Sequence, residues 1–525
     1  MDTGDIVFLA KEKAAYKQIL RPAHNFRNGW DVVPMLWGDR AYIIEKERSR
    51  LKLSAKGHHF WAPARDFTTQ QILSVWQIDC GQGDAALVNL PDDRWLLVDG
   101  GPHKKDSNSG PTALSFLYWL NFVDFSWRRE FQQTRQSFHI DGMVSTHPDF
   151  DHYGGLMDLH ESNMLGLSSQ STSRNTKFSV GTYFHNGMGR FGGPVDTQLG
   201  PLVGDTAPDL FLSVLIDGFP DVGRYLSKGP GRTWTLNGRY RTFLSNLLAK
   251  LGSGVGSMRR VSHRDGHLPG YNDGPCTIKL LGPVVEEYSP GKEGLRFLDD
   301  NTSKGRSSPS LTRNGHSVVM RLDYGEARIL LTGDLNFRSQ ALMMQHIESN
   351  EFACDVAKAC HHGSEDISWK FLQAVSPVAT MFSCGDNNSY AHPRARALGL
   401  AAHFSHKVQL NKTDSYLGFS EPRLSSPLLY CTELSRSVEL WKPRAVYDSK
   451  GTRVRAPQIE AQPRVRGGVS PKMSLSDWRL ADKLVYGLIN VRTDGEKVLL
   501  GALKDDKSSF QVETFKAGQW RERNG

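Results

Sequence analysis

Short apolar runs, each ended by glycine or a polar cluster, recur along most of this chain. They predict buried β-strands at Val75–Asp79, Trp95–Asp99, Ile140–Val144, Thr277–Leu281, Val318–Leu322, Ala327–Leu331 and Val356–Cys360. Apolar residues at helical spacing predict helices near Thr112–Val123 and over Phe243–Leu251, Arg338–Glu348 and Lys370–Val375. Strands interleaved with helices are typical of an α/β (α+β) protein.

The pattern changes before and within this region. Residues 1–70 predict a small amino-terminal domain or a strap over the core, with a helix at Glu12–Leu20 and a strand-and-turn unit at Ala41–Leu53. Residues 71–442 are expected to form the main domain. Its segment from about 156 to 275 is rich in Gly, Ser and Asn and reads as an insertion.

The carboxyl-terminal part carries a different pattern. Strands at Pro427–Thr432 and Val438–Trp441 are expected to close the core, and residues 443–470, with Pro, Gly and Arg but no periodicity, predict a basic linker. Residues 471–525 then predict a small β-rich unit of three strands, at Leu484–Val491, Lys497–Leu503 and Phe510–Phe515.

Composition narrows the class of protein. The chain has 525 residues, 39% of them hydrophobic, and no run approaches the roughly 18 apolar residues of a membrane span. The first residues lack the features of a secretion signal, and the six cysteines are scattered without a CxxC pair. We therefore expect a cytoplasmic protein with reduced thiols. A net charge of +8 weakly favours a polyanionic partner.

One loop is unusually dense in groups that can bind metal. The run Ile140–Val144 leads into Ser145–Gly155, where two imidazoles and two carboxylates lie between His147 and His152. Open α/β sheets place their chemistry at the carboxyl ends of strands. Because one ion cannot easily use four donors at such close spacing, the cluster favours a pair of metal ions, and imidazole with carboxylate suits Zn, Mn or Fe. The alternative is a polar, solvated loop.

Further candidate ligands follow other predicted strands. Asp334 comes after Ala327–Leu331, His361 and His362 come after Val356–Cys360, and His316 precedes Val318–Leu322. These positions strengthen the metal interpretation.

The order of these motifs resembles that of the metallo-β-lactamase-fold hydrolases, most of all the soluble hydrolase module of the competence DNA-uptake channel (ComEC-like). The matching segments are Asp79–Asp84, Leu97–Gly101, His147–His152, Leu331–Asp334, His361–Ser364 and Tyr390–Pro393. The resemblance implies a four-layer αβ/βα sandwich. Asp149 supports the competence-type branch, because the wider superfamily usually has histidine at that position.

The resemblance also implies two divalent metal ions, Zn or Mn, and a ligand set. One ion would be held by His147, Asp149 and His316, and the other by Asp151, His152 and His362, with Asp334 bridging them. For His316 a second interpretation stays open, namely a strand-entry histidine that bonds a backbone carbonyl. Side chains alternate along an extended strand, so only one of His361 and His362 is expected to face the site, and the family pattern favours His362.

Other charged residues have supporting roles in this interpretation. Asp79, Asp84 and Asp99 are expected to hydrogen-bond the far nitrogens of the ligand histidines and fix their tautomers. For Asp79 and Asp84, turn chemistry around the neighbouring glycines is an equal alternative. Lys358 is interpreted as a charge flanking its strand.

The reaction implied by the resemblance is hydrolysis by a hydroxide that two metal ions activate, with Asp151 and Asp334 at the catalytic centre. A phosphodiester fits best, because two ions can hold the attacking and the leaving oxygen. His392 is a candidate proton donor or phosphate-binding group, or else a surface histidine. Ser364, Asn388, Arg394 and Arg396 are candidate substrate-binding residues.

We therefore predict a nuclease or phosphodiesterase acting on DNA or RNA. Basic residues at Lys304–Arg313 and Arg394–Arg396 flank the metal motifs, as phosphate neutralisation requires. One alternative is a hydrolase of a small ester, lactam or nucleotide messenger, which needs a closed pocket. Another is a metal-bearing binding protein without turnover that contacts a protein partner through the carboxyl-terminal β-unit.

Overall fold

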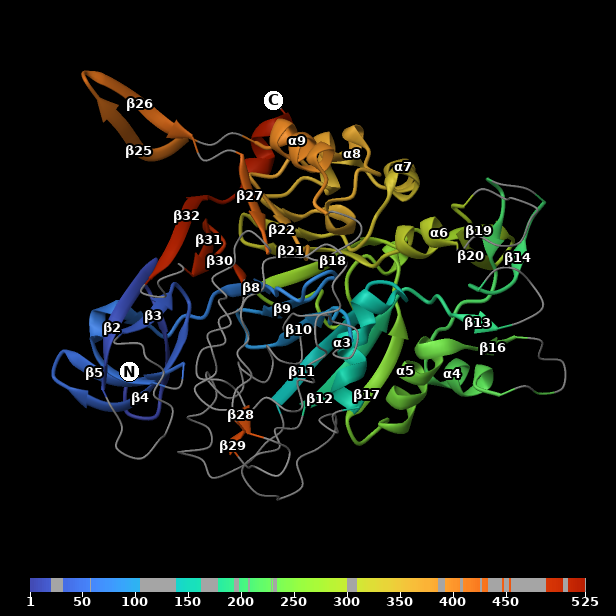
Figure 1. Ribbon diagram of the computed structural model, residues 1–525, viewed down its shortest axis with the longest axis horizontal. Helices are drawn as coiled ribbons and strands as arrows, with labels where there is room; N and C mark the ends of the chain where they lie inside the picture. The colour runs from blue at the N-terminus through green and yellow to red at the C-terminus, as the bar shows by residue number, and fades with distance from the viewer. Residues whose placement is uncertain are drawn as a thin grey trace.

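The computed structural model describes most of the chain (Figure 1). The described residues are 1–19, 32–56, 58–103, 138–161, 178–192, 198–205, 208–227, 229, 234–299, 309–385, 392–406, 409–424, 427–432, 446–447, 453–454, 488–503 and 509–524. The helix predicted at Thr112–Val123, the strand at Val438–Trp441, Asn388, and nearly all of the 443–470 linker lie outside these residues.

The amino-terminal residues form a sheet with its own core, at the blue end of the molecule in Figure 1. Its strands are β1 (Ile6–Leu9), β2 (Lys13–Ile19), β3 (Val32–Leu36), β4 (Arg40–Glu47), β5 (Arg50–Ala55), β6 (His58–Pro63) and β7 (Phe67–Thr68), with the 3₁₀ turn η1 (Ala64–Asp66) before the last. The sheet order is β3-β2-β6-β5-β4-β1-β7. The strand-and-turn unit at 41–53 is confirmed as β4 and β5.

The helix predicted at Glu12–Leu20 is wrong. Lys13–Ile19 pairs antiparallel with β3 and with β6, and the Tyr16 ring stacks on Phe60 at a centroid distance of 4.9 Å. Strand pairing and a buried aromatic outweigh the local helical propensity of this short segment.

The first core sheet has nine strands in the order β17-β12-β11-β10-β9-β8-β30-β31-β32. The strands are β8 (Leu73–Gln77), β9 (Ala86–Asn89), β10 (Trp95–Val98), β11 (Phe138–Ser145), β12 (Phe178–His185), β17 (Val255–Arg260), β30 (Ile489–Thr493), β31 (Lys497–Leu503) and β32 (Phe510–Lys516). β10, β11, β12 and β17 run parallel, so their carboxyl ends lie at one edge.

The second core sheet has six strands in the order β18-β21-β22-β23-β24-β27. They are β18 (Cys276–Gly282), β21 (Val319–Tyr324), β22 (Ala327–Leu331), β23 (Val356–Lys358), β24 (Ala379–Phe382) and β27 (Leu428–Cys431). Val98 and Val144 of the first sheet share one buried cluster with Met320 and Ile329 of the second, so the two sheets pack face to face.

Helices cover the outer faces and complete a four-layer αβ/βα sandwich, which confirms the predicted fold. On the first sheet lie α3 (Phe150–Glu161), α4 (Phe219–Tyr225) and α5 (Gly238–Ala249). On the second lie α6 (Ser310–Gly315), α7 (Phe337–His346), α8 (Trp369–Val375) and α9 (Ala395–Phe404). The helices predicted at 338–348 and 370–375 are thus present. Within the part of the chain described here, none of the helices is long and apolar enough to cross a membrane.

The carboxyl-terminal strands are not a separate unit. All three predicted strands are present, but β30 pairs with β8 and extends the first core sheet. Ile489, Val491 and Leu500 are fully buried in the core between the sheets. Because these strands belong to the core, the reason for expecting a partner-binding unit there no longer holds.

The predicted insertion is also smaller than expected. α3, β12, α5 and β17 belong to the core layers. Two small sheets are added to these layers. One pairs β13 (Phe191–Gly192) with β16 (Thr235–Leu236), and the other contains β14 (Leu202–Val203), β15 (Phe211–Leu212), β20 (Lys292–Arg296) and β19 (Glu286–Ser289).

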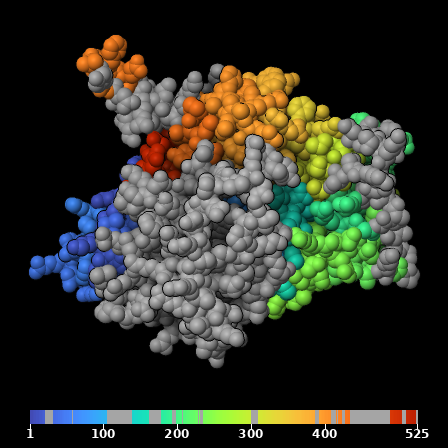
Figure 2. Space-filling model, in the orientation of Figure 1, coloured from blue at the N-terminus to red at the C-terminus, as the bar shows by residue number. Residues whose placement is uncertain are grey.

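The hairpin β25 (Gln409–Tyr416) and β26 (Phe419–Leu424) projects from the body, as Figure 2 also shows. β28 (Val446–Tyr447) pairs with β29 (Arg453–Val454).

Candidate metal centre

Three loops from the two core sheets meet around one buried carboxylate. β11 ends at Ser145, and the chain passes through His147 into α3, whose first turn carries Asp151 and His152. β22 ends three residues before Asp334. β23 leads into the 3₁₀ turn η4 (Cys360–Gly363). The sheets therefore bring together residues that are far apart in the sequence.

Glycines allow the first of these loops to approach its neighbour. A Cβ atom on Gly155 would overlap the backbone carbonyl of Gly100, and one on Gly100 would overlap the backbone of Leu156. The close contact lets the Gly100 amide donate to the His152 carbonyl at 2.7 Å. The glycine pairs in the two motifs thus hold α3 against the end of β10.

Asp334 is at the centre of the cluster. Its Oδ2 atom lies 3.2 Å from Nε2 of His152 and 3.2 Å from Nε2 of His362. The same oxygen lies 3.7 Å from Nε2 of His361 and 4.0 Å from Nε2 of His147. Four imidazoles thus surround one carboxylate that is almost fully buried.

The geometry fits a divalent cation. Donor atoms converge in four groups: His147, His152 and Asp334; Asp151, His152 and His362; Asp84, Asp334 and His362; and Asp84, Asp99 and His152. Among the described residues, Nε2 of His147, His152 and His362 and Oδ1 of Asp334 are buried without a hydrogen-bond partner. Buried polar atoms normally have a hydrogen-bond partner. Several buried nitrogen and oxygen atoms that converge without such a partner therefore indicate a site for a bound ion.

The aspartates behind the histidines fix their orientation. Asp99 Oδ2 lies 2.8 Å from Nδ1 of His152 and accepts from the Thr146 hydroxyl at 2.7 Å. Nδ1 of His362 lies 3.0 Å from the Ser383 carbonyl and 3.3 Å from Asp84. Contacts of this kind leave Nε2 to face a metal. Asp79 accepts from the Gly81 amide at 3.3 Å, which is the turn chemistry of the alternative interpretation.

The electrostatics centre on Asp334. Burial opposes ionisation of its carboxyl, but His362 and His152 hold the pKa well below its usual value. Burial disfavours charge on His152 and His362, yet Asp334 raises the pKa of each imidazole well above its usual value. Burial and the nearby His152 lower the pKa of His147. A bound divalent cation would take the place of the protons on His152 and His362 as the partner of Asp334.

Two of the predicted ligands are not brought into these groups. Asp149 lies 3.8 Å from Nε2 of His147 but forms ion pairs with Arg313 and, at 3.5 Å, with Arg190. His316 bonds the Arg296 carbonyl through Nε2 at 2.7 Å. His316 is buried, and this bond to a backbone carbonyl is the contact that the second interpretation expected.

Replacing His316 with alanine should therefore leave the metal content unchanged. The loss should be structural, about 1–3 kcal/mol of unfolding free energy, since a buried carbonyl loses its partner. Metal analysis and urea denaturation measure the two effects separately. Loss of one equivalent of metal at unchanged stability would instead return His316 to the ligand set.

Strand β23 ends at Lys358, so the side-chain alternation expected at His361 and His362 does not apply to them. Both residues lie in η4, with φ values of 45° and 55°. Because this left-handed turn breaks the alternation of a strand, both Nε2 atoms approach Asp334. His362 is buried and belongs to the donor groups, whereas the His361 side chain is 30% exposed.

The predicted substrate-binding residues lie beside this turn. The Arg394 amide donates to the Gly363 carbonyl at 2.8 Å, and the Ser364 amide donates to the His361 carbonyl at 2.8 Å. The His392 ring is 5.7 Å from that of His361, and burial and the nearby His362 lower its pKa to about 4. Burial and the neighbouring histidines thus favour the neutral form of His392. Arg396 is exposed on α9.

Sequence reasoning missed Lys358, which is not a flanking surface charge. Its side chain is 3% exposed, pairs with Asp84, and lies 3.8 Å from Oδ1 of Asp334. Nζ also donates to the Gly333 carbonyl at 2.8 Å. The sequence could have indicated this role. A lysine within the apolar run of β23 is expected to be buried, and a buried lysine needs an anionic partner.

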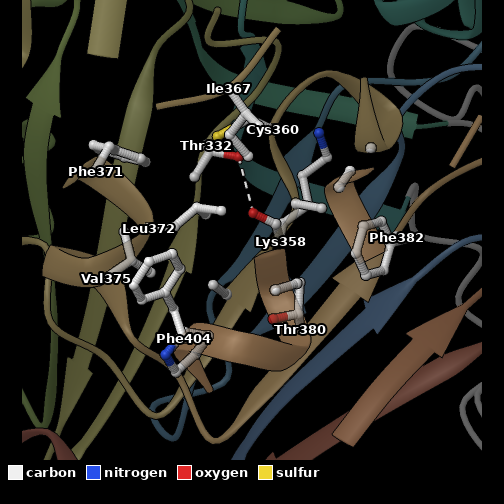
Figure 3. A pocket seen from close by; sticks show the side chains of 16 residues that line it. Thr332, Lys358, Cys360, Ile367, Phe371, Leu372, Val375, Thr380, Phe382 and Phe404 are labelled. Carbon is white, nitrogen blue, oxygen red and sulfur yellow. Dashed lines mark hydrogen bonds between the residues drawn. The ribbon is translucent and has the colours of Figure 1, made fainter. Parts of the chain in front are cut away.

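An apolar cavity lies behind the turn (Figure 3). Phe371, Phe382 and Phe404 are among its walls, with Cys360 and the stem of Lys358. The Lys358 carbonyl accepts from Thr332 at 3.0 Å, while Nζ is bonded to Gly333 and Asp84. None of the side chains in the four donor groups around Asp334 lines this cavity.

Comparison with known proteins agrees with the geometry. The model of the metallo-β-lactamase superfamily matches residues 78–165. The chain is 31% identical to ComE operon protein 3 of Bacillus subtilis (strain 168) over 135 residues, 25% of this chain and 17% of that protein. It is 34% identical to competence protein ComA of Neisseria gonorrhoeae over 102 residues, 19% of this chain and 14% of that protein. The aligned segments thus span less than a fifth of each relative, and they support a competence-type metallo-β-lactamase fold.

Proposed function

We propose that this protein of the metallo-β-lactamase superfamily is a metal-dependent phosphodiesterase that acts on nucleic acid. The single observation that carries the proposal is the buried Asp334 carboxylate, faced by Nε2 of His152 and His362 at 3.2 Å each. Asp151, with its Oδ2 3.7 Å from Nε2 of His362, completes a set of four donors.

These four residues would hold the cation, and imidazole with carboxylate suits Zn or Mn. When bound, a divalent ion lowers the pKa of water toward neutrality and offsets negative charge on a reacting phosphate. Asp99 and Asp84 hold His152 and His362 in position. To bind a cation, His152 and His362 would have to be neutral at Nε2 and Asp334 would have to be ionised.

The surroundings favour a phosphate group over a neutral ester. Arg394 sits on the metal-binding turn through its bond to Gly363, and Arg313 and Arg190 lie at Asp149. One of the two relatives is named a competence protein. A small ester or lactam would not need these cations. A metal-bearing binding protein without turnover would keep the same metal-binding atoms, so the hydrolysis assay separates it from an enzyme. Location in the cytoplasm stays a prediction.

The test is hydrolysis by protein reconstituted with Mn or Zn, using labelled single- and double-stranded DNA and RNA. Cleavage of any of these that a chelator abolishes is expected. Cleavage of a small ester or lactam, with intact nucleic acid, would move the function to the small-substrate alternative.

Binding of a single-stranded oligonucleotide should weaken steeply with salt, by about 0.7 in log–log slope for each phosphate contacted. Exchanging Arg394 and Arg396 for glutamine should flatten the slope, because it removes two positive charges. The Arg394 backbone is bonded to the metal-binding turn at Gly363, and Arg396 is exposed nearby in the sequence. Titrations in chelator keep the strand intact. The exposed pair Arg48 and Arg50 on the amino-terminal sheet, exchanged likewise, is the control and should leave the slope unchanged. A flat response in the wild-type protein would contradict a polymeric substrate.

A further inference from the structure

Asp149 is surrounded by donors from two other segments. Its Oδ1 atom pairs with Nε of Arg313 at the end of α6, and with Arg190, between β12 and β13, at 3.5 Å. In the orientation of the Asn314 side-chain amide that gives both its nitrogen and its oxygen a partner, the nitrogen donates to Oδ2 of Asp149 at 2.9 Å. The Arg190 side chain also donates to the Pro148 carbonyl at 3.3 Å. Both oxygens of Asp149 are thus engaged by protein groups.

The two predicted metal positions are therefore unequal. Asp151, His152, His362 and Asp334 converge and make up one complete position. The other was expected to use His147, Asp149 and His316, but neither Asp149 nor His316 belongs to any donor group of the described residues. His147 alone keeps its place, with Nε2 4.0 Å from Asp334.

Two arginine side chains, those of Arg313 and Arg190, bring positive charge to the position where the second metal ion was expected. Arg313 is 11% exposed, and Arg190 is 27% exposed, so two guanidinium groups are held partly buried beside one carboxylate. These three side chains carry two positive charges and one negative charge. Arg is the residue best suited to a phosphate group, because its planar guanidinium group can donate to two oxygens at once.

We propose that Arg313, fixed by Asp149 and assisted by Arg190, takes the place of the second metal ion and binds a phosphate oxygen of the substrate. The protein then uses one divalent ion, held by Asp151, His152, His362 and Asp334. This inference rests on the proposed phosphodiesterase function. It assigns Arg313 to the substrate phosphate and Asp149 to the positioning of Arg313, in place of metal binding.

Metal content and phosphate binding test the inference apart from turnover. Protein loaded with Mn or Zn and then dialysed should hold one equivalent per chain. Calorimetry with inorganic phosphate should show affinity at least about tenfold weaker in Arg313→Gln, the usual effect of losing a charge-assisted bond. Arg260→Gln is the matched control, because Arg260 forms an ion pair with Asp217 at 2.5 Å away from the donor groups. It should bind phosphate like the wild type.

Two equivalents of tightly held metal in the wild type would overturn the inference, as would unchanged phosphate affinity in Arg313→Gln. The wild-type metal count needs no variant, so a misfolded Arg313→Gln protein would not prevent a decision. Failure of the proposed function looks different, because the wild-type protein would then bind no metal or leave phosphodiesters intact. Two bound ions together with normal cleavage would contradict the role of Arg313 and leave the proposed phosphodiesterase function standing.

Discussion

Exchanging Asp334 for asparagine should reduce hydrolysis on the order of 10³-fold or more. The carboxylate faces four imidazoles and is almost fully buried. Asparagine has nearly the same shape but no charge, so the variant loses the anion that holds the cation together with His152 and His362. A loss of several kcal/mol of transition-state stabilisation corresponds to this factor. The measurement is the turnover of a labelled oligonucleotide at saturating Mn or Zn, with metal content determined in parallel.

Asp355→Asn is the matched control for that experiment. Asp355 is also fully buried, but its oxygens accept from the backbone amides of Arg328 and Gln519 at 2.9 and 3.0 Å. That variant should lose stability and keep the metal. If Asp334→Asn kept turnover within about tenfold of the wild type, Asp334 would not bind the catalytic ion.

The parts of the site that the sequence predicts best are those where a strand ends in a loop. Apolar runs identify β11 and β22, and strand ends in open sheets converge at one edge. His152, Asp334 and His362 could therefore be expected near one another, and they are. Asp99 follows β10 by the same rule and reaches His152.

The sequence does not predict a residue's contacts where these depend on an unusual backbone conformation or on a partner far away in the chain. Nothing in the residues around His361 and His362 announces a left-handed turn, so the alternation of a strand was assumed. Asp149 pairs with Arg313, which lies far away in the chain, and no local sequence pattern reveals this partner. The same holds for Ile489 and Val491, whose apolar alternation predicts a strand but not that β30 would pair with β8.

Lys358 leads to the second large effect, on stability. Burial alone would lower the pKa of its ammonium group, but the Asp84 and Asp334 carboxylates raise it above the usual value. Removing the cation leaves the buried carboxylates of Asp84 and Asp334 close together without the ammonium group that offsets their charge. Breaking a buried pair in this way typically costs about 3–5 kcal/mol. Lys358→Met should therefore lower the free energy of unfolding by this amount.

Denaturation in chelator, so that no metal supplies the missing charge, measures this cost. The double variant Lys358→Met with Asp84→Asn removes both partners and should recover much of the loss, which yields the coupling energy of the pair. Lys279→Met is the matched control, since Lys279 forms an ion pair with Glu351 at 2.7 Å but both side chains are partly exposed, and such pairs contribute about 0–1 kcal/mol. If Lys358→Met cost no more than Lys279→Met, Lys358 would not be the charge that allows Asp84 and Asp334 to remain ionised side by side.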